Sequence, residues 1–146
     1  RKYALADYTM FIGSGALWGE TILYSMCILE EMQWKRTRYI TSADFFHGTL
    51  ELVEPGVPVF LFMGEDENRK LDERVRAFLT RGVTGDTDIN IIDTAEFAIP
   101  GLDDEFRVIV SPWILTVLVT DRLARYYETV TKHNLKYRRY YHQFDY

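Results

Sequence analysis

Residues 8–12 form a short run of aromatic, β-branched and apolar side chains that ends at Gly13, Ser14 and Gly15. A run of this kind before a glycine-rich turn predicts a buried strand that leads directly into a helix. The apolar segment 57–63 and the segment 88–93 predict two more strands, and a short one is expected at 38–40. These runs constrain the fold most, because strands buried on both faces need a covering layer on each side.

Segments with helical periodicity lie between the expected strands. Apolar residues recur every three or four positions in 16–33 and in 66–79, which predicts an amphipathic helix in each. The apolar segment 106–130 predicts one long helix, or two helices joined near Pro112. Strands that alternate with helices indicate an α/β fold, a three-layer sandwich in which helices flank a mostly parallel sheet.

The length and composition suit one domain. Of the 146 residues 47% are hydrophobic, so the chain can bury a sizeable core. We expect 1–146 to be a single domain, with 132–146 as an ordered C-terminal tail. Basic and aromatic residues alternate in this tail, a pattern also found in platforms for single-stranded nucleic acid. We favour instead aromatic rings that pack on the domain and arginines that meet carboxylates or phosphate.

Charge and cysteine content exclude several classes of protein. A net charge of −5 argues against nucleic acid as the main partner. No uninterrupted apolar run approaches the roughly 20 residues that a membrane-spanning helix needs. The single cysteine, Cys27, cannot form an internal disulfide. We therefore expect a cytoplasmic protein without nucleic-acid or membrane partners.

Two glutamates, Glu30 and Glu31, end the apolar part of segment 16–33. Glu31 lies one helical turn beyond Cys27 and close to one turn before Trp34. Apolar surroundings would disfavour its charged form, as a general base that works near neutral pH requires. The alternative is that both carboxylates are solvated at the helix end. Spacing cannot choose, because Glu30 also follows an apolar residue by four positions.

The second candidate for chemistry is His47, sixteen residues after Glu31. Ser42 is expected to cap a short helix over 43–47, which places His47 near its end. A histidine beside two phenylalanines is commonly a core residue, and that interpretation stays open. Metal binding is the weaker idea, because His133 and His142 are far along the chain, Cys27 lies in an apolar helical segment, and no spacing typical of zinc ligands occurs. We expect no metal and no cofactor.

The turn Gly13, Ser14, Gly15 could direct backbone N–H groups towards an anion at the start of the helix. It lacks the third glycine of a dinucleotide fingerprint, so ordinary strand-to-helix geometry is the alternative. Asp93 and Thr94 follow the last expected strand, at the carboxyl edge where open α/β sheets bind ligands.

Four segments in order carry a resemblance to a known family. They are 13–34, 42–51, 53–69 and 138–141, and they resemble the second sugar isomerase (SIS) domain of the fructosamine 6-phosphate deglycases. The resemblance covers nearly the whole chain and implies a flavodoxin-like fold.

The resemblance also implies roles for individual residues. Glu31, before Met-Gln-Trp, corresponds to the family's general base, and His47 to a histidine that assists as an acid. Their spacing is similar to that in the isomerase domain of glucosamine 6-phosphate synthase, where the histidine comes from the partner subunit, so a homodimer or higher homo-oligomer is implied. Gly13, Ser14, Gly15, Arg139 and Tyr140 are candidates for binding the phosphosugar. A preceding SIS domain with a phosphate loop is implied, which makes this chain the C-terminal half of its enzyme.

Three positions depart from the family pattern. Ala43 and Asp44 stand where the family has Gly-Glu, and Thr49 stands where a proline follows His-Gly. These changes could re-aim the loop that presents His47. The three departures bear on which substrate is used more than on the type of reaction.

Chemistry connects these residues to one reaction. In an opened fructosamine 6-phosphate, removal of a C1 proton gives an enaminol, which becomes an imine when C2 is reprotonated. Water then releases glucose 6-phosphate and the amine. The weak C–H acid needs a positioned base, Glu31, and the developing oxyanion needs a donor, for which His47 is suited unless it serves ring opening. The alternatives are an amino-sugar phosphate isomerase and a non-catalytic module that senses phosphosugars.

Overall fold

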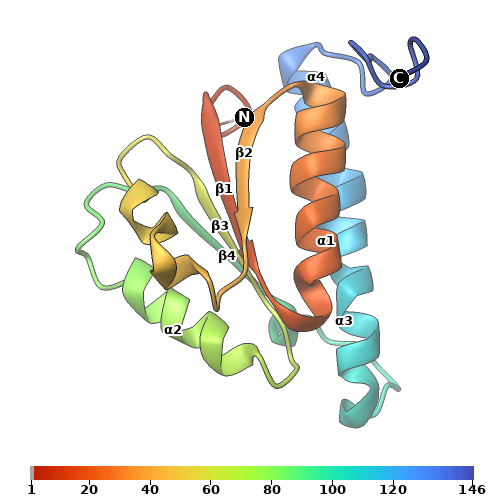
Figure 1. Cartoon of the computed structure of the whole chain (residues 1–146). Coiled ribbons are helices and arrows are strands. Elements are labelled where there is room, and N and C mark those ends of the chain that lie inside the picture. Colours follow the sequence, from red (N-terminus) through yellow and green to blue (C-terminus); the bar gives the residue numbers. More distant parts are fainter. Residues whose placement is uncertain (1) are drawn as a thin grey trace.

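The computed structural model describes residues 2–146, and it consists of a four-stranded parallel sheet between two layers of helices (Figure 1). In space the strands follow the order β2-β1-β3-β4, which is the order of flavodoxin-like sheets. The expected α/β sandwich is therefore confirmed. The strands are β1 (Tyr8–Gly13), β2 (Arg36–Ile40), β3 (Val59–Met63) and β4 (Ile89–Asp93).

One face of the sheet has an aromatic core. Side chains of a strand alternate between its two faces, so β1 and β3 direct Phe11, Phe60 and Phe62 to this side. The rings of Phe11 and Phe60 stack with centroids 5.2 Å apart, and Tyr24 meets Phe11 edge-on at 5.4 Å. The helix after β1 and the C-terminal helices cover this face (Figure 1). They comprise η1 (Gly15–Leu17), α1 (Trp18–Ile22), the π-helical η2 (Leu23–Met32), η6 (Asp104–Phe106), α3 (Arg107–Leu115), the π-helical η7 (Thr116–Leu123) and α4 (Ala124–Thr131).

The opposite face carries an aliphatic core. Met10 and Ile12 of β1 and Val59, Leu61 and Met63 of β3 are fully buried there. They pack against α2 (Arg69–Leu79) and the 3₁₀ turn η3 (Phe45–His47), with the next turn η4 (Thr49–Leu52) beside them (Figure 1). Between β4 and the C-terminal helices the chain forms a short turn, η5 (Thr94–Glu96).

The segment 106–130 is one continuous helical run rather than two helices, although it contains Pro112. Proline has no N–H to donate to the carbonyl four residues earlier, here that of Val108. The hydroxyl of Ser111 donates to this carbonyl at 3.3 Å instead. A local substitute for the lost hydrogen bond therefore lets the helix pass through the proline.

The expectation that Ser42 caps a helix over 43–47 is wrong. The Ser42 hydroxyl donates to Oδ1 of Asp72 at 2.6 Å, and 3₁₀ turns replace the helix. Asp72 is only 1% exposed on α2, and burial raises the pKa of its carboxyl group. A buried carboxyl group needs hydrogen-bond donors, and the N–H of Gly64 supplies another at 3.2 Å.

None of the helices within residues 2–146 combines the length and the apolar character needed to cross a membrane.

Candidate functional site

The carboxyl edge of the sheet is the usual ligand position in this topology, because β1 and β3 send their following helices to opposite faces. In this chain a side chain of the protein occupies the start of the first helix. Oδ2 of Asp66 accepts a hydrogen bond from the N–H of Ala16 at 2.6 Å. Gly15 has φ +54°, and a Cβ atom here would lie 2.1 Å from that oxygen. The hydroxyl oxygen of Ser14 accepts from the N–H of Ser42 at 2.7 Å. The turn that could bind an external anion thus already holds a carboxylate.

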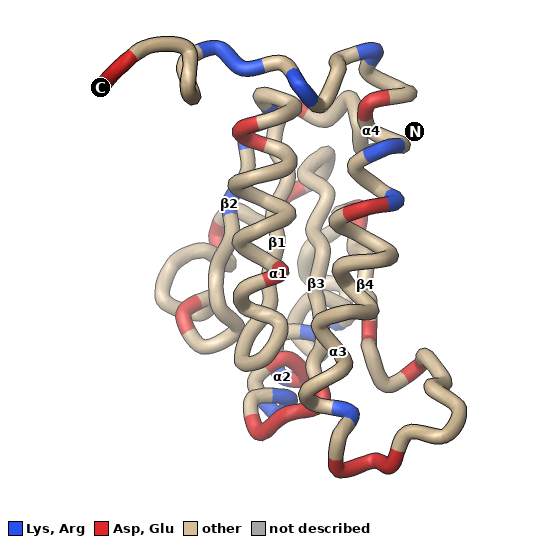
Figure 2. The backbone as a smooth tube through the Cα atoms, turned by 90° about the vertical axis from the view of Figure 1, so that its right-hand side faces the viewer, with Lys and Arg blue, Asp and Glu red and all other residues tan. Residues whose placement is uncertain are grey.

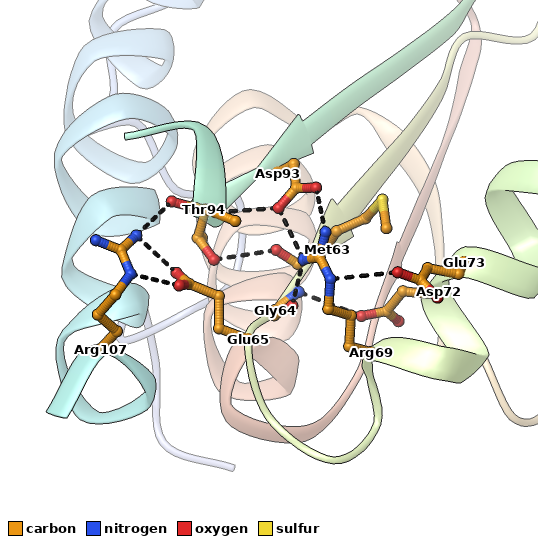
Figure 3. Close-up of polar contacts among 10 residues, drawn as sticks. Met63, Gly64, Glu65, Arg69, Asp72, Glu73, Asp93, Thr94 and Arg107 are labelled. Carbon is orange, nitrogen blue, oxygen red and sulfur yellow. Dashed lines mark hydrogen bonds and ion pairs between the residues drawn. The ribbon is translucent and has the colours of Figure 1, made fainter. Parts of the chain in front are cut away.

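Two ion pairs close the rest of this edge (Figure 3). The guanidinium of Arg69 donates to both carboxylate oxygens of Asp93, at 2.9 and 2.7 Å, and to the carbonyl of Gly64. Arg107 on α3 donates to both oxygens of Glu65, so this contact ties the loop after β3 to the C-terminal helices. These polar groups therefore already have partners within the chain, and their contacts join the sheet to the helices on its two faces.

Replacing Asp93 by Asn should destabilise the protein in a pH-dependent way. The Arg69 guanidinium lowers the pKa of Asp93 from its ordinary 3.8, and Asp93 itself is only 5% exposed. The carboxylate therefore contributes stability above pH 3.8, which is lost as the pH falls through the lower pKa of the folded state. We expect Asp93→Asn to reduce the free energy of unfolding by about 2 kcal/mol at neutral pH.

Urea unfolding over a pH series measures this difference. The difference in free energy of unfolding between the wild-type protein and Asp93→Asn should become smaller when the pH falls below the range in which carboxyl groups ordinarily titrate. A difference that does not depend on pH would contradict the role of the Asp93 carboxylate. Asp121→Asn is the matched control, because the Asp121–Arg125 pair lies exposed on one helix and should matter little.

At the opposite edge of the sheet lies a cavity of about 500 Å³, between the end of η2, the start of β2 and the C-terminal tail. It is lined on the domain side by Glu30, Glu31, Trp34, Lys35 and Arg36, and on the tail side by residues 138–141. Among the candidate residues it contains Glu31, Arg139 and Tyr140. The Gly13–Ser14–Gly15 turn lies at the other end of the same strand layer.

Glu31 is partly buried and ion-paired. Nε of Arg138 lies 2.9 Å from Oε1 of Glu31. The side chain of Glu31 is 27% exposed and that of Arg138 is 18% exposed. The apolar surroundings expected for this carboxylate are thus replaced on one side by a guanidinium. Glu30 has a different partner, because its Oε1 accepts from the hydroxyl of Thr37 on β2. The structure therefore separates two glutamates that spacing could not distinguish.

Arg138 and Arg139 use their guanidinium groups differently. Arg138 also donates to the carbonyls of Leu135 and Tyr137, so it anchors the tail. The guanidinium of Arg139 lies over the ring of Trp34, 4.2 Å from the centroid. The expectation that arginines of the tail meet carboxylates is confirmed for Arg138. The aromatic rings of the tail were expected to pack on the domain. This is wrong for most of them, since the tyrosines and the phenylalanine at 137, 140, 141, 144 and 146 are 47–85% exposed.

His47 lies apart from Glu31 within one chain. It belongs to η3, whose Phe45 is buried in the aliphatic core, and its own side chain is exposed. Glu31 belongs to η2, which packs on the aromatic core of the opposite face. One chain therefore does not bring the two candidate catalytic groups together. Thr49, at the position of the family proline, accepts a long hydrogen bond of 3.4 Å from Arg38 on β2, and its side chain is buried.

Sequence reasoning missed Asp66 and the contact between Trp34 and the tail. Trp34 has φ +54°, which is unusual for a residue other than glycine, and its ring also meets His133 at 4.3 Å. Asp66 reaches a residue fifty positions earlier, and no local pattern announces such a contact.

Comparison with known proteins identifies the family. No family model matches the chain. It is 33% identical over 136 residues to fructosamine deglycase FrlB of Bacillus subtilis, an alignment that covers 91% of this chain and 39% of that protein. It is 34% identical over 116 residues to fructoselysine 6-phosphate deglycase of Escherichia coli, covering 77% and 31%. A phosphosugar isomerase structure from Bacillus subtilis superimposes with a TM-score of 0.88 at 30% identity, covering 99% of this chain and 43% of that one. The chain belongs to the SIS family that includes the fructosamine deglycases.

Membership of this SIS family confirms the resemblance seen in the sequence. A second SIS-fold structure, from Salmonella typhimurium, superimposes with a TM-score of 0.85 at 30% identity and covers 99% of this chain. The C-terminal domain of a Francisella tularensis glucosamine-fructose-6-phosphate aminotransferase, 16% identical with a TM-score of 0.59, shares the fold. The chain spans 39% and 31% of the two deglycases above, so it corresponds to only part of such an enzyme.

Proposed function

We propose that this chain is the C-terminal SIS domain of a phosphosugar deglycase, which cleaves a fructosamine 6-phosphate to glucose 6-phosphate and a free amine. The observation that carries the proposal is Glu31, a carboxylate held by Arg138 at the wall of a cavity large enough for a small ligand. Membership of the SIS family that includes fructosamine deglycases supports the same reaction.

Glu31 acts as the general base in this proposal. Its Oε1 is fixed by Nε of Arg138, so the carboxylate is oriented before the substrate binds. An oriented base avoids part of the entropic cost of reaching the transition state. Removal of the C1 proton gives the enaminol, reprotonation at C2 gives the imine, and water divides the imine into the two products. The first two steps move protons only. In the third, the oxygen of water bonds to C1 and the C1–N bond breaks, with the nitrogen leaving protonated as the free amine, so the reaction needs water, an acid and a base.

His47 acts as the proton donor from a second copy of the chain. A homodimer is proposed because Glu31 and His47 lie on opposite faces of the sheet in one chain. In a two-fold dimer the same two surfaces meet twice, which gives two equivalent sites. The exposed position of His47 leaves it accessible to such a partner.

The rest of the same polypeptide is a second proposed partner, in the form of an N-terminal SIS domain. Apolar side chains are exposed along the α3–η7 helix, where Ile109 and Trp113 are each 68% exposed and Val117 is 49% exposed. Such a stripe is typical of a contact surface. The deglycases that match this chain are more than twice its length, so they have ample further chain to cover it.

Substrate binding is assigned to two groups of residues. Arg139 and Tyr140 line the cavity beside Glu31. A role for Gly13, Ser14 and Gly15 in binding an anion would require Asp66 to move away from the helix start. We place the enzyme in the cytoplasm, where Cys27 would remain reduced.

The proposal is tested with the full-length protein and synthetic fructoselysine 6-phosphate. We expect glucose 6-phosphate and lysine to appear in equal amounts, with glucose 6-phosphate measured by a coupled dehydrogenase and the amine by chromatography. Conversion to an isomeric sugar phosphate without amine release would favour the isomerase alternative. Ligand binding without any turnover would favour the sensing module, and either result would overturn the proposal.

A further inference from the structure

Trp34 follows the helical run that carries Glu31, and its backbone conformation is one that a tryptophan rarely adopts. Its φ is +54°, in the left-handed region. Its N–H donates to the carbonyl of Glu30 at 3.1 Å. The next N–H, of Lys35, donates to the carbonyl of Leu29 at 2.9 Å, and the two bonds close the end of η2. A left-handed residue after a helix is usually glycine, because a Cβ atom is strained there. The side chain of Trp34 is therefore present at a position where glycine would be more stable.

The indole ring of Trp34 contacts the C-terminal tail at two places. It meets the ring of His133 edge-on, with centroids 4.3 Å apart, and the guanidinium of Arg139 lies over it, 4.2 Å from the centroid. The electrons on the face of an indole attract such a cation. Glycine could make neither contact. The ring thus joins the start of the tail and a later part of it to the end of η2.

The residue that fixes Glu31 lies between these two contacts in the sequence. Nε of Arg138 is 2.9 Å from Oε1 of Glu31, and Arg138 follows His133 and directly precedes Arg139. Figure 2 shows the tail running past the end of the helix that begins with α1, with basic residues (blue) near that end. Because the ring of Trp34 holds the tail on both sides of Arg138, it limits how far that guanidinium can move from the carboxylate.

Other hydrogen bonds attach the start of the tail to the domain. Nε2 of Gln33, whose side chain is only 5% exposed, donates to the carbonyl of His133 at 2.7 Å. The N–H of Leu135 donates to a carboxylate of α4 at 3.1 Å. These bonds do not depend on the ring of Trp34. Loss of the ring should therefore loosen the part of the tail that carries Arg138 and leave the domain folded.

We infer that Trp34 is a positioning residue for the general base: its ring fixes the tail so that Arg138 holds the carboxylate of Glu31 in place. This inference rests on the proposed function and extends it, because it adds a residue that acts through Arg138. Backbone strain at a functional site persists where the surrounding contacts enforce it, as the two contacts of the ring do here. Loss of the ring should lower kcat more than it changes KM, since the orientation of the base matters most in the transition state.

Two glycine substitutions at left-handed helix ends test the inference in the full-length enzyme. Trp34→Gly removes the ring and also relieves the backbone strain, so its Tm should stay close to that of the wild type while kcat falls about tenfold or more. Lys132→Gly is the matched control, because Lys132 ends α4 with φ +58° and is exposed. It should leave kcat unchanged. Trp34→Phe keeps an aromatic ring for the guanidinium and should stay within about threefold of the wild-type kcat.

A double-mutant cycle with Arg138→Met shows whether Trp34 acts through Arg138. Methionine keeps an unbranched side chain but has no N–H to hold Glu31. In the Arg138→Met background, Trp34→Gly should lower kcat little further, because the contact that the ring supports is already lost. Losses that multiply would mean that Trp34 acts independently of Arg138, and they would overturn the inference.

The inference also fails if Trp34→Gly keeps the wild-type kcat. It fails as well if this variant is unfolded at the assay temperature, because the ring would then serve the fold and not the base. In each of these cases the wild-type enzyme still releases glucose 6-phosphate and the amine. If the wild-type enzyme releases neither product, the proposed function itself fails.

Discussion

Glu31→Gln in the full-length enzyme should reduce kcat for release of glucose 6-phosphate by roughly 10²–10⁴-fold, the range that a general base contributes. The amide cannot accept the C1 proton. Glutamine has nearly the same size and shape as glutamate, and its carbonyl oxygen can lie against Nε of Arg138 where Oε1 lies now, so the cavity and the tail should keep their arrangement. KM should change much less than kcat, because the lost group acts mainly in the transition state.

Glu30→Gln provides a closely matched control. Glu30 is adjacent in sequence and lines the same cavity, but its carboxylate is directed to Thr37 on β2. Its replacement should lower turnover far less. If the two variants lost activity equally, or if Glu31→Gln remained within a few-fold of wild type, Glu31 would not be the base. A fluorescence-monitored thermal transition would show whether each variant is folded.

The fold was predictable from sequence because its signals are local. The strands at 8–12 and 57–63 and the helix after Gly15 follow from periodicity and turn residues within short windows. Phe11 and Phe60, buried on one face, and Met10 and Val59, buried on the other, alternate along their strands as two-sided burial requires. The passage of the last helix through Pro112 depended on one neighbouring hydroxyl, that of Ser111, which periodicity does not reveal.

The surroundings of the site were less predictable, because they depend on contacts between distant parts of the chain. Apolar neighbours in sequence suggested apolar surroundings for Glu31, but the tail returns and places Arg138 against it. Asp66 reaches Ala16 across the carboxyl edge in the same way. The aromatic content of the tail suggested burial, yet Phe144 meets Tyr140 and Tyr146 of the tail itself, and all three side chains stay exposed.

Mixing two inactive variants should restore activity if Glu31 and His47 meet only across a dimer interface. Glu31→Gln and His47→Asn should each be nearly inactive alone. In a mixed dimer one site has both substitutions, and the other has an intact Glu31 from one chain and an intact His47 from its partner. Random exchange of subunits at equal concentrations should therefore recover about a quarter of wild-type activity in a two-fold dimer.

The control replaces the His47→Asn protein by the double variant Glu31→Gln/His47→Asn. Its mixed dimers with Glu31→Gln contain no intact Glu31, so no activity should return. Two affinity tags, one on each variant, would isolate the mixed dimers and show that exchange has occurred. Mixed dimers that stay inactive would mean that the two groups do not act together across the interface. Because the two residues lie on opposite faces of the sheet in one chain, that result would also remove His47 from the mechanism.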